Sequence, residues 1–282
     1  EFFLSTEDIP VYTLPDWETL PYDQFSPHRE IISERLSTLY QILTSKKCIV
    51  LAAVQTLMHL LCPKDYILSR VFKVKVGDNV CLEALRERLC GINYDLVPQV
   101  ESQGEYSVRG SIIDIFPMGS DEAFRIDFFD NEVDEIRIFD VEDQRTIEKI
   151  QEINLLPARE YPFSKESISE FRTNWREAFD SDPRLSPLYQ EVSAGVMSAG
   201  VEYYLSLFFS ELNTFDICGF LSWSNRGSQP LKHPPLCLFA HPHSSVKSRE
   251  ETSLRHIKPP APCIRRIARH IAEVPHRPCS LK

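Results

Sequence analysis

Hydrophobic and polar residues alternate most regularly between positions 104 and 130, in two runs on either side of the turn-like segment 117–120. Strand side chains point alternately to the two faces of a sheet, so these runs predict an antiparallel pair with one buried face. In the first run, residues 106–116, the face predicted to be buried holds Val108, Ile112 and Phe116. In the second, residues 124–129, it holds Phe124, Ile126 and Phe128.

The opposite face of this pair is predicted to carry Arg109 and Arg125 close together, with the aromatic ring of Phe129 beside them. Arginine and aromatic residues dominate the binding energy of many protein interfaces, so this face is a candidate docking patch. Spacing alone favours a plainer interpretation, in which solvated arginines pair only with Asp127.

Four stretches of the chain, taken in order, resemble one known family. They are PDWETLPYDQFSPHREIISERLSTLYQ (15–41), the strand pair itself, IFDVEDQRT (138–146) and EINLLPARE (152–160). Over residues 1–210 the chain is similar to the amino-terminal UvrB-like region of the transcription-repair coupling factors (Mfd). Because the motifs are long and keep their order, the resemblance is specific, and it covers about three quarters of the chain.

The resemblance implies a degenerate copy of the nucleotide-excision-repair protein UvrB whose second domain binds UvrA. The UvrA-contacting arginines of the family lie in the motifs EY-x-x-RG and YRLDFF, which fall here on Arg109 and Arg125. The contacting phenylalanine falls on Phe129, and Asp127 is assigned a supporting role. We therefore expect a non-catalytic docking module that recruits UvrA in transcription-coupled nucleotide excision repair, and we expect Arg125→Ala to abolish binding without changing the fold.

The predicted fold class is α/β plus α+β. A partial helicase-like α/β layer of the UvrB domain 1 type carries an inserted antiparallel α+β domain. The predicted domains are 1–70 (partial domain 1A), 71–157 (UvrA docking), 158–210 (partial, helical domain 1B) and a tail, 211–282. Relative to the family, a leading helix-and-strand segment is missing.

Local signals predict the elements of the first part. Ser26-Pro27 is a suitable N-cap and first-turn pair for a helix that continues to about Leu43. The apolar run 48–54 predicts a parallel strand covered on both sides, followed by a short helix at about 56–61.

Later signals predict a helix closed by Gly91 at its C′ position, and a tight turn at Asp130-Asn131. Ser164 is expected to cap a further helix, and a short helix is expected at 188–193. The longer of these two helices has an apolar stripe that we assign to core packing rather than to a cofactor: Ile168, Phe171, Trp175 and Phe179.

The tail differs in composition from the rest of the chain. Residues 211–282 hold nine of the 20 prolines and six of the eight histidines, so no apolar period survives. We predict disorder there, and we hypothesise that a frameshift or a gene-model artefact replaced the native continuation.

Charge divides the chain in the same place. Residues 1–210 carry 20 Lys and Arg against 36 Asp and Glu, a net −16, whereas residues 211–282 carry 11 against 5, a net +6. A strongly acidic body repels phosphate backbones, so a protein partner is favoured over nucleic acid.

Eight cysteines without a CxxC pair, and neither a leader nor an apolar span, indicate a reduced, soluble and cytoplasmic protein. We also expect it to be a monomer.

No nucleotide site is expected. A P-loop requires GxxxxGK[ST], and the GxxxxG stretch 195–200 is followed by Val201 and Glu202, which offer phosphate no positive charge. No set of catalytic residues can be assembled from residues 1–210, where His28 and His59 are the two histidines. Two alternatives remain open: a UvrB-type helicase fragment that binds ATP and DNA, or a pseudogene product without function.

No metal site or cofactor is expected either. Cys237, His241 and His243, with Cys218, lack the paired spacing of a zinc site. A second cluster of acidic residues could in principle bind Ca²⁺ or Mg²⁺, but we assign it to the solvent-exposed edge of a hairpin. Its members are Asp127, Asp130, Asp134 and Glu135.

Overall fold

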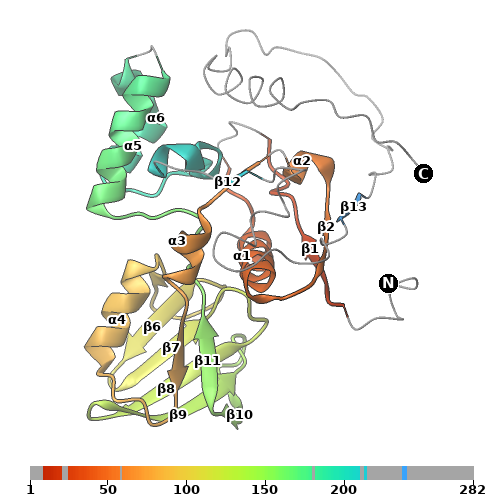
Figure 1. Cartoon of the computed structure of the whole chain (residues 1–282). Helices are drawn as coiled ribbons and strands as arrows, with labels where there is room; N and C mark the ends of the chain where they lie inside the picture. The colour runs from red at the N-terminus through yellow and green to blue at the C-terminus, as the bar shows by residue number, and fades with distance from the viewer. Residues whose placement is uncertain are drawn as a thin grey trace, which may run out of the picture.

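The computed structural model describes residues 9–20, 25–57, 59–179, 182–209, 213–214 and 237–239. They form a mixed α/β fold, with a three-stranded sheet, a six-stranded sheet and two two-stranded ribbons (Figure 1). The predicted disorder and the cysteine and histidine side chains of residues 211–282 lie outside the described residues.

A small parallel layer forms the first part of the fold. Strands β1 (Val11–Leu14) and β2 (Ile49–Ala52) pair in parallel, and helix α1 (Arg29–Thr44) connects them. Strand β13 (Cys237–Phe239) pairs in parallel with the other edge of β2. The parallel strand predicted from the apolar run 48–54 is thereby confirmed.

Helix α1 begins later than the sequence predicts. Its N-cap is His28, and Ser26 makes a tertiary contact in place of a cap. The Ser26 hydroxyl accepts a hydrogen bond from the Gly200 N–H at 3.1 Å and donates one to Glu202 Oε2 at 2.9 Å. A long-range network therefore takes the polar side chain that the helix end would otherwise use.

The connection after β2 also differs from the prediction of a helix at 56–61. Helix α2 (Val54–Leu57) comes earlier, and residues 60–61 form strand β3 (Leu60–Leu61), which pairs antiparallel with β12 (Asn213–Thr214). Helix α3 (Lys64–Leu68) follows and leads into the next unit.

Residues 72–155, here called the antiparallel unit, contain one helix and eight strands. The helix is α4 (Leu82–Gly91). The strands are β4 (Phe72–Lys75), β5 (Asp95–Leu96), β6 (Glu105–Arg109), β7 (Ile112–Phe116), β8 (Ala123–Phe129), β9 (Glu132–Phe139), β10 (Thr146–Ile150) and β11 (Glu152–Leu155). The six-stranded sheet has the order β10-β9-β8-β7-β6-β5, and β4 pairs antiparallel with β11 as a separate ribbon.

One face of the six-stranded sheet is buried. Helix α4 contributes Leu85 and Leu89 to this core, and the β4–β11 ribbon contributes Val74 and Ile153. Helix α1 closes the end of the same core with Ile32 and Leu36, while its Leu39 and Ile42 belong to the core of the parallel layer. The two cores therefore meet along a single helix.

The turn between β7 and β8 fixes the antiparallel unit to α1. The Gly119 N–H donates to Ser33 Oγ at 2.7 Å, and Gly119 has a φ of +78°. A Cβ at this position would lie 2.8 Å from Leu156 Cδ1 and 3.2 Å from Ser37 Cβ. Both the positive φ and the close approach require glycine at this turn.

The run 106–116 is a hairpin, not the single strand that its alternation predicts. Gly110 and Ser111 form a two-residue turn between β6 and β7, with Arg109 paired to Ile112. Before the turn the even-numbered residues face the core, and after it the odd-numbered residues do. Ile113 and Ile115 lie in the core, and Ile112 and Phe116, predicted to be buried with Val108, lie on the opposite face.

Two backbone details of this unit can be compared with the sequence predictions. Helix α4 does not end with a glycine in the C′ position, because Gly91 is its last residue and Asn93 has the positive φ, 66°. The tight turn at Asp130-Asn131 is confirmed, with Asp130 at a φ of 52°.

The chain then becomes helical, with α5 (Lys165–Ala178), η1 (Pro183–Leu185), α6 (Pro187–Ser193) and η2 (Val201–Phe208). Ser164 caps α5 as predicted, in a capping box with Ser167. Phe171 and Trp175 from the predicted stripe are buried in an aromatic core with Tyr189 and Phe208. The assignment of this stripe to packing is confirmed.

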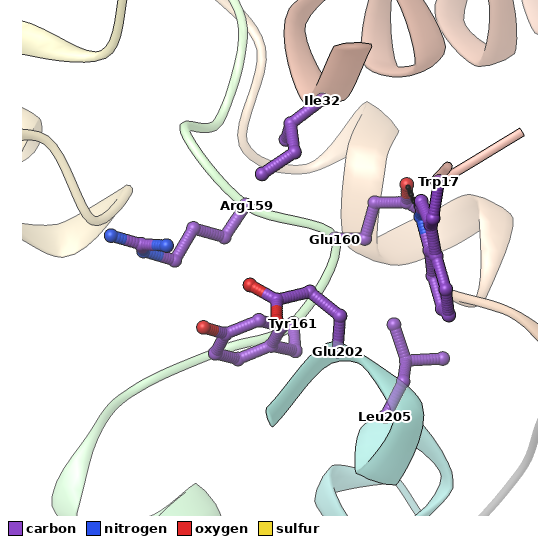
Figure 2. A pocket seen from close by; sticks show the side chains of 7 residues that line it. All are labelled: Trp17, Ile32, Arg159, Glu160, Tyr161, Glu202 and Leu205. Atoms are coloured by element: carbon purple, nitrogen blue, oxygen red, sulfur yellow. Dashed lines mark hydrogen bonds between the residues drawn. The ribbon is translucent and has the colours of Figure 1, made fainter. Parts of the chain in front are cut away.

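A buried ion pair joins these parts. Arg35 of α1 donates from Nε to Glu160 Oε1 at 2.7 Å and from Nη1 to the Pro15 carbonyl at 2.7 Å. The Arg35 and Glu160 side chains are 0% and 4% exposed. The Trp17 indole stacks on the His59 ring, with 4.6 Å between the ring centres. Its Nε1–H donates to Glu160 Oε1 at 3.5 Å, and both side chains are drawn in Figure 2. The pair thus holds helix α1, the N-terminal strand segment and the chain that leaves the antiparallel unit.

Removing one member of this pair should be costly. Arg35→Ala leaves the Glu160 carboxylate buried without its cation, and we expect it to lower the free energy of unfolding by about 3–5 kcal/mol. Arg184→Ala is the matched control, since that arginine is 87% exposed and pairs only with its neighbour Asp182 among the described residues. Chemical denaturation of both variants measures the difference. Similar losses in the two variants would contradict the assigned role of the pair.

A second expected outcome concerns pH. Burial raises the pKa of Glu202, whose carboxylate lies among the buried side chains of Figure 2. An acid with a raised folded-state pKa contributes stability below its unfolded pKa and loses it as pH rises through the folded value. We therefore expect Glu202→Gln to become more stable relative to the unmodified chain as pH rises above the ordinary titration range of glutamic acid.

The control for this pH prediction is Glu166→Gln. A hydrogen bond with Ser164 lowers the pKa of exposed Glu166, so this carboxylate contributes stability above its unfolded pKa. Glu166→Gln should therefore be less stable than the unmodified chain at neutral pH, and this difference should disappear as pH falls. Thermal melting across the pH range measures both differences. A pH-independent difference between Glu202→Gln and the unmodified chain would refute the prediction.

Candidate protein-docking site

The face of the six-stranded sheet that is turned away from its core carries two cross-strand rows made up, apart from Ile112, of polar residues. Residues directly opposite each other across a sheet project to the same side, so the pairing register defines these rows. The first row is Ser107, Asp114, Arg125 and Arg137. The second row is Arg109, Ile112, Asp127 and Glu135.

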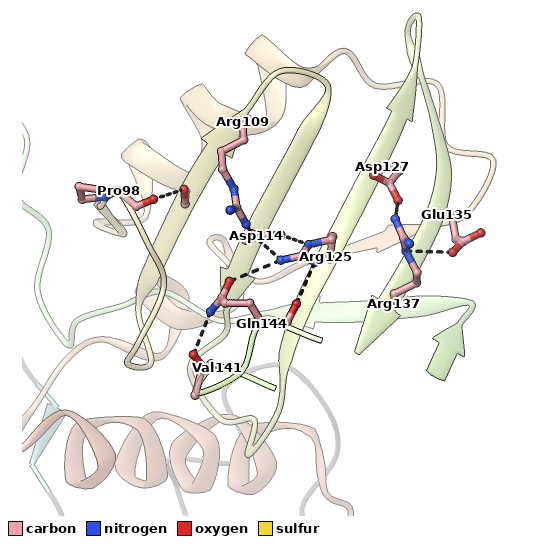
Figure 3. Close-up of polar contacts among 10 residues, drawn as sticks. Pro98, Arg109, Asp114, Arg125, Asp127, Glu135, Arg137, Val141 and Gln144 are labelled. Carbon is pink, nitrogen blue, oxygen red and sulfur yellow. Dashed lines mark hydrogen bonds and ion pairs between the residues drawn. The ribbon is translucent and has the colours of Figure 1, made fainter. Parts of the chain in front are cut away.

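Asp114 lies between the two arginines that the sequence singles out (Figure 3). Its Oδ1 accepts from Arg125 Nε at 2.6 Å, and its Oδ2 accepts from Arg125 Nη2 at 3.0 Å. Oδ2 also accepts a short hydrogen bond from Arg109 Nη2. One carboxylate, 2% exposed, thereby binds two guanidinium groups.

Arg125 is held on several sides. Its Nη1 donates to the Gln144 carbonyl at 3.3 Å, and its guanidinium lies 4.7 Å from the centre of the Phe139 ring. Only 15% of the side chain is exposed. The sequence prediction that Arg125 lies close to Arg109 on this face agrees with the structure, but most of its hydrogen-bond donors are used within the chain.

Arg109 and Phe129 are the accessible members of the predicted site. Arg109 ends β6 with a side chain that is 52% exposed, and within the described residues Asp114 is its one hydrogen-bond partner. Phe129 ends β8 and is 72% exposed. A large aromatic ring at this exposure, on the same sheet face as an exposed arginine, has the composition of an interface anchor.

Asp127 has a different partner from the one that the plainer sequence interpretation assigned to it. It accepts a short hydrogen bond from Arg137 Nη2, and Arg137 Nε lies 2.9 Å from Glu135 Oε1 (Figure 3). Glu135 also pairs with Lys149 of β10. The interpretation in which Arg109 or Arg125 pairs only with Asp127 is therefore wrong.

Sequence reasoning missed Asp114 and Gln144. The alternation was read as one strand across Gly110-Ser111, which placed Asp114 on the buried face and Ile113 on the outer one. The Gly-Ser dipeptide, flanked by alternating residues, was the available signal for a two-residue hairpin turn. Gln144 lies in a loop and has a positive φ of 62°, which no sequence periodicity indicates.

Other candidate sites gain little support. The GxxxxG stretch 195–200 connects helix α6 to η2, whereas a P-loop connects a strand to a helix. The cavity of Figure 2 has a volume of only about 10 Å³, far too small for a nucleotide. Burial lowers the pKa of His59, which packs on Trp17 in the interior.

Metal and membrane features can be examined only in part of the chain. Over the described ranges, no group of three or more His, Cys, Asp or Glu side chains is arranged to hold a metal ion. Within the same ranges, no helix combines the length and the apolar character needed to cross a bilayer.

Comparison with known proteins adds an independent observation. Residues 72–161 match the UvrB interaction domain family, a stretch that includes the whole antiparallel unit. The chain is 48% identical over 201 residues to a transcription-repair-coupling factor of Escherichia coli, covering 71% of this chain and 18% of that protein. A homologue from Haemophilus influenzae is 48% identical over 213 residues, covering 75% of this chain and 18% of that protein.

A more distant relative shows the same pattern. The transcription-repair-coupling factor of Rickettsia bellii is 32% identical over 213 residues, covering 74% of this chain. In each case the chain spans about a fifth of the relative's length, 18%.

The geometry of the site predicts unequal effects of the two arginines on stability. Arg125→Ala leaves Asp114 buried with one remaining cation and should lower the free energy of unfolding by about 2–3 kcal/mol. Arg109→Ala removes a half-exposed partner and should cost less than about 1 kcal/mol. Denaturant unfolding of both variants checks the order, and equal losses would contradict it. The expectation that Arg125→Ala abolishes UvrA binding without changing the fold stays a prediction, and its binding must be measured together with its stability.

Proposed function

The chain carries a segment of the transcription-repair-coupling factor family, with a UvrB interaction domain at residues 72–161, and we propose that this segment docks UvrA for nucleotide excision repair. Docking takes place on the polar face of the six-stranded sheet. Arg109 and Phe129 are the anchors, Arg125 adds charge at the centre of the face, and Asp127 supports its edge.

One observation carries this proposal: Arg109 and Phe129 are exposed together on the face where Asp114 gathers the positive charge. Arg109 is half exposed, and four of its five N–H donors have no partner among the described residues. A planar guanidinium can give two parallel hydrogen bonds to a carboxylate, which fixes both distance and orientation. The partner surface is accordingly expected to present a carboxylate and an apolar recess.

The remainder of the segment has a supporting role in this proposal. The parallel β1–α1–β2 layer, which resembles a partial helicase-like domain, supplies α1 as a wall of the docking unit's core. We propose that this segment is non-catalytic, and that its domains follow the predicted boundaries 1–70, 71–157 and 158–210. No geometric feature of the described residues favours the alternative of an ATP- and DNA-binding helicase fragment.

The proposal is tested by measuring affinity for purified UvrA. Arg109→Ala and Phe129→Ala should each weaken binding at least about tenfold, because truncation of an arginine or aromatic hot spot costs about 2 kcal/mol or more. Calorimetry or biolayer interferometry gives the dissociation constants. The melting temperature of each variant should remain close to that of the unmodified chain, since both side chains are largely exposed.

Matched controls lie in the helical part of the chain. Arg184 is 87% exposed and Leu185 is 81% exposed, so their alanine variants remove large exposed side chains. Both belong to η1, between helices α5 and α6, which Figure 1 shows at the end of the molecule away from the six-stranded sheet. Both variants should bind UvrA with unchanged affinity. Full affinity in Arg109→Ala and Phe129→Ala, or no binding by the unmodified chain, would overturn the proposal.

A further inference from the structure

We infer that Asp114 is the positioning residue of this docking face: its buried carboxylate fixes Arg109 so that the free N–H donors of that arginine meet a single carboxylate on the partner. The inference rests on the proposed function and deepens it, because it names a residue that touches no partner and the chemistry that the partner must supply.

The cluster of Asp114, Arg109 and Arg125 carries one net positive charge, while the neighbouring Arg137 is paired with Asp127 and Glu135. Two guanidinium groups contribute +2 and the carboxylate contributes −1, all joined by direct hydrogen bonds. Arg125 is the more enclosed of the two cations, with donors directed to Asp114 and to Gln144. The surplus charge is therefore presented mainly by Arg109, which is 52% exposed compared with 15% for Arg125.

Orientation is the second contribution of Asp114. Arg109 is the last residue of β6, next to the hairpin turn, and its long side chain would otherwise sample many rotamers. The hydrogen bond to Asp114 ties one nitrogen of the guanidinium to a buried acceptor that itself cannot move. Ordering a side chain before the partner arrives removes an entropic cost of binding, so a fixed Arg109 should bind more tightly than a free one.

The register also defines the spacing that the partner must match. Arg109 lies opposite Ile112, which lies opposite Asp127, and Phe129 is two residues further along β8. Strands about 4.8 Å apart and a rise of about 3.4 Å per residue place the Cα atoms of Arg109 and Phe129 about 12 Å apart. The Arg109 guanidinium is bonded to Asp114, whose row lies on the side of the Ile112–Asp127 row away from Phe129. The carboxylate and the apolar recess of the partner should therefore be separated by more than this Cα distance.

A double-mutant cycle tests the inference with the whole chain and purified UvrA. Asp114→Asn keeps the side-chain volume but removes the charge, and it should weaken UvrA binding about tenfold. In an Arg109→Ala background the same change should weaken binding less than twofold further, because the group that Asp114 positions is already absent. Equal effects in the two backgrounds would show a general structural role and overturn the inference.

A second background keeps the test decisive if Asp114→Asn alone does not fold. Arg125→Gln together with Asp114→Asn removes both buried charges and leaves a neutral pair that can hydrogen-bond. Asp114→Asn should still weaken binding about tenfold relative to Arg125→Gln alone, and Arg109→Ala should then add less than twofold. Additive effects of Asp114→Asn and Arg109→Ala in this background would likewise refute the positioning role.

A measurement on the free protein separates this inference from the proposed function. Nitrogen-15 NMR of the arginine side chains reports rotation of the Arg109 guanidinium, which should be slow in the unmodified chain and fast in Asp114→Asn. Fast rotation in both would overturn the inference even where UvrA binds. Slow rotation only in the unmodified chain, without UvrA binding by that chain, would support the positioning of Arg109 and reject the docking function.

Discussion

The fold depends on an ion pair that is almost completely shielded from water. Arg35 and Glu160 come from opposite sides of the antiparallel unit in sequence, yet they bond directly at 2.7 Å in the interior. Two buried charges are stable there only because each also has further polar contacts, through the Pro15 carbonyl and the Trp17 indole. Because the two charges need these partners, the ion pair fixes the position of α1 relative to the segment that contains Glu160. Since Ile32 and Leu36 of α1 lie in the core of the antiparallel unit, the sheet is oriented by the same constraint.

The same principle operates on the docking face at a smaller scale. Asp114 is buried on a surface otherwise rich in exposed polar groups, and it is acceptable there because two arginines satisfy it. The outer face next to this row is covered by a small cluster that includes Ala123 and Phe139. Phe139 in turn lies under the Arg125 guanidinium. The result is a face in which charge is held rigidly by packing rather than presented on mobile side chains.

Much of this arrangement was accessible from the sequence. Alternation along residues 124–129 correctly placed Arg125 and Phe129 on the face opposite the core, because one unbroken strand keeps its parity. The prediction failed at Gly110-Ser111, where a two-residue turn reverses parity without interrupting the pattern. That reversal brought Asp114 to the arginines. The period of the segment does not reveal it, and the Gly-Ser dipeptide is the one local sequence signal of the turn. Ser26 illustrates another limit, since its bond with Glu202 joins residues that only the tertiary fold brings together.

The antiparallel unit starts and finishes on neighbouring strands, with Phe72 of β4 opposite Leu155 of β11. Opposed Cα atoms in an antiparallel pair are about 5 Å apart, a gap that one or two residues can bridge. The whole unit can thus be viewed as a cassette inserted into a host chain, whose path would stay continuous were the cassette excised or exchanged for a homologous one. What resists such an exchange is the side of α1 that faces the cassette, because an incoming version must offer a matching surface to Ile32 and Leu36 and a glycine turn to Ser33.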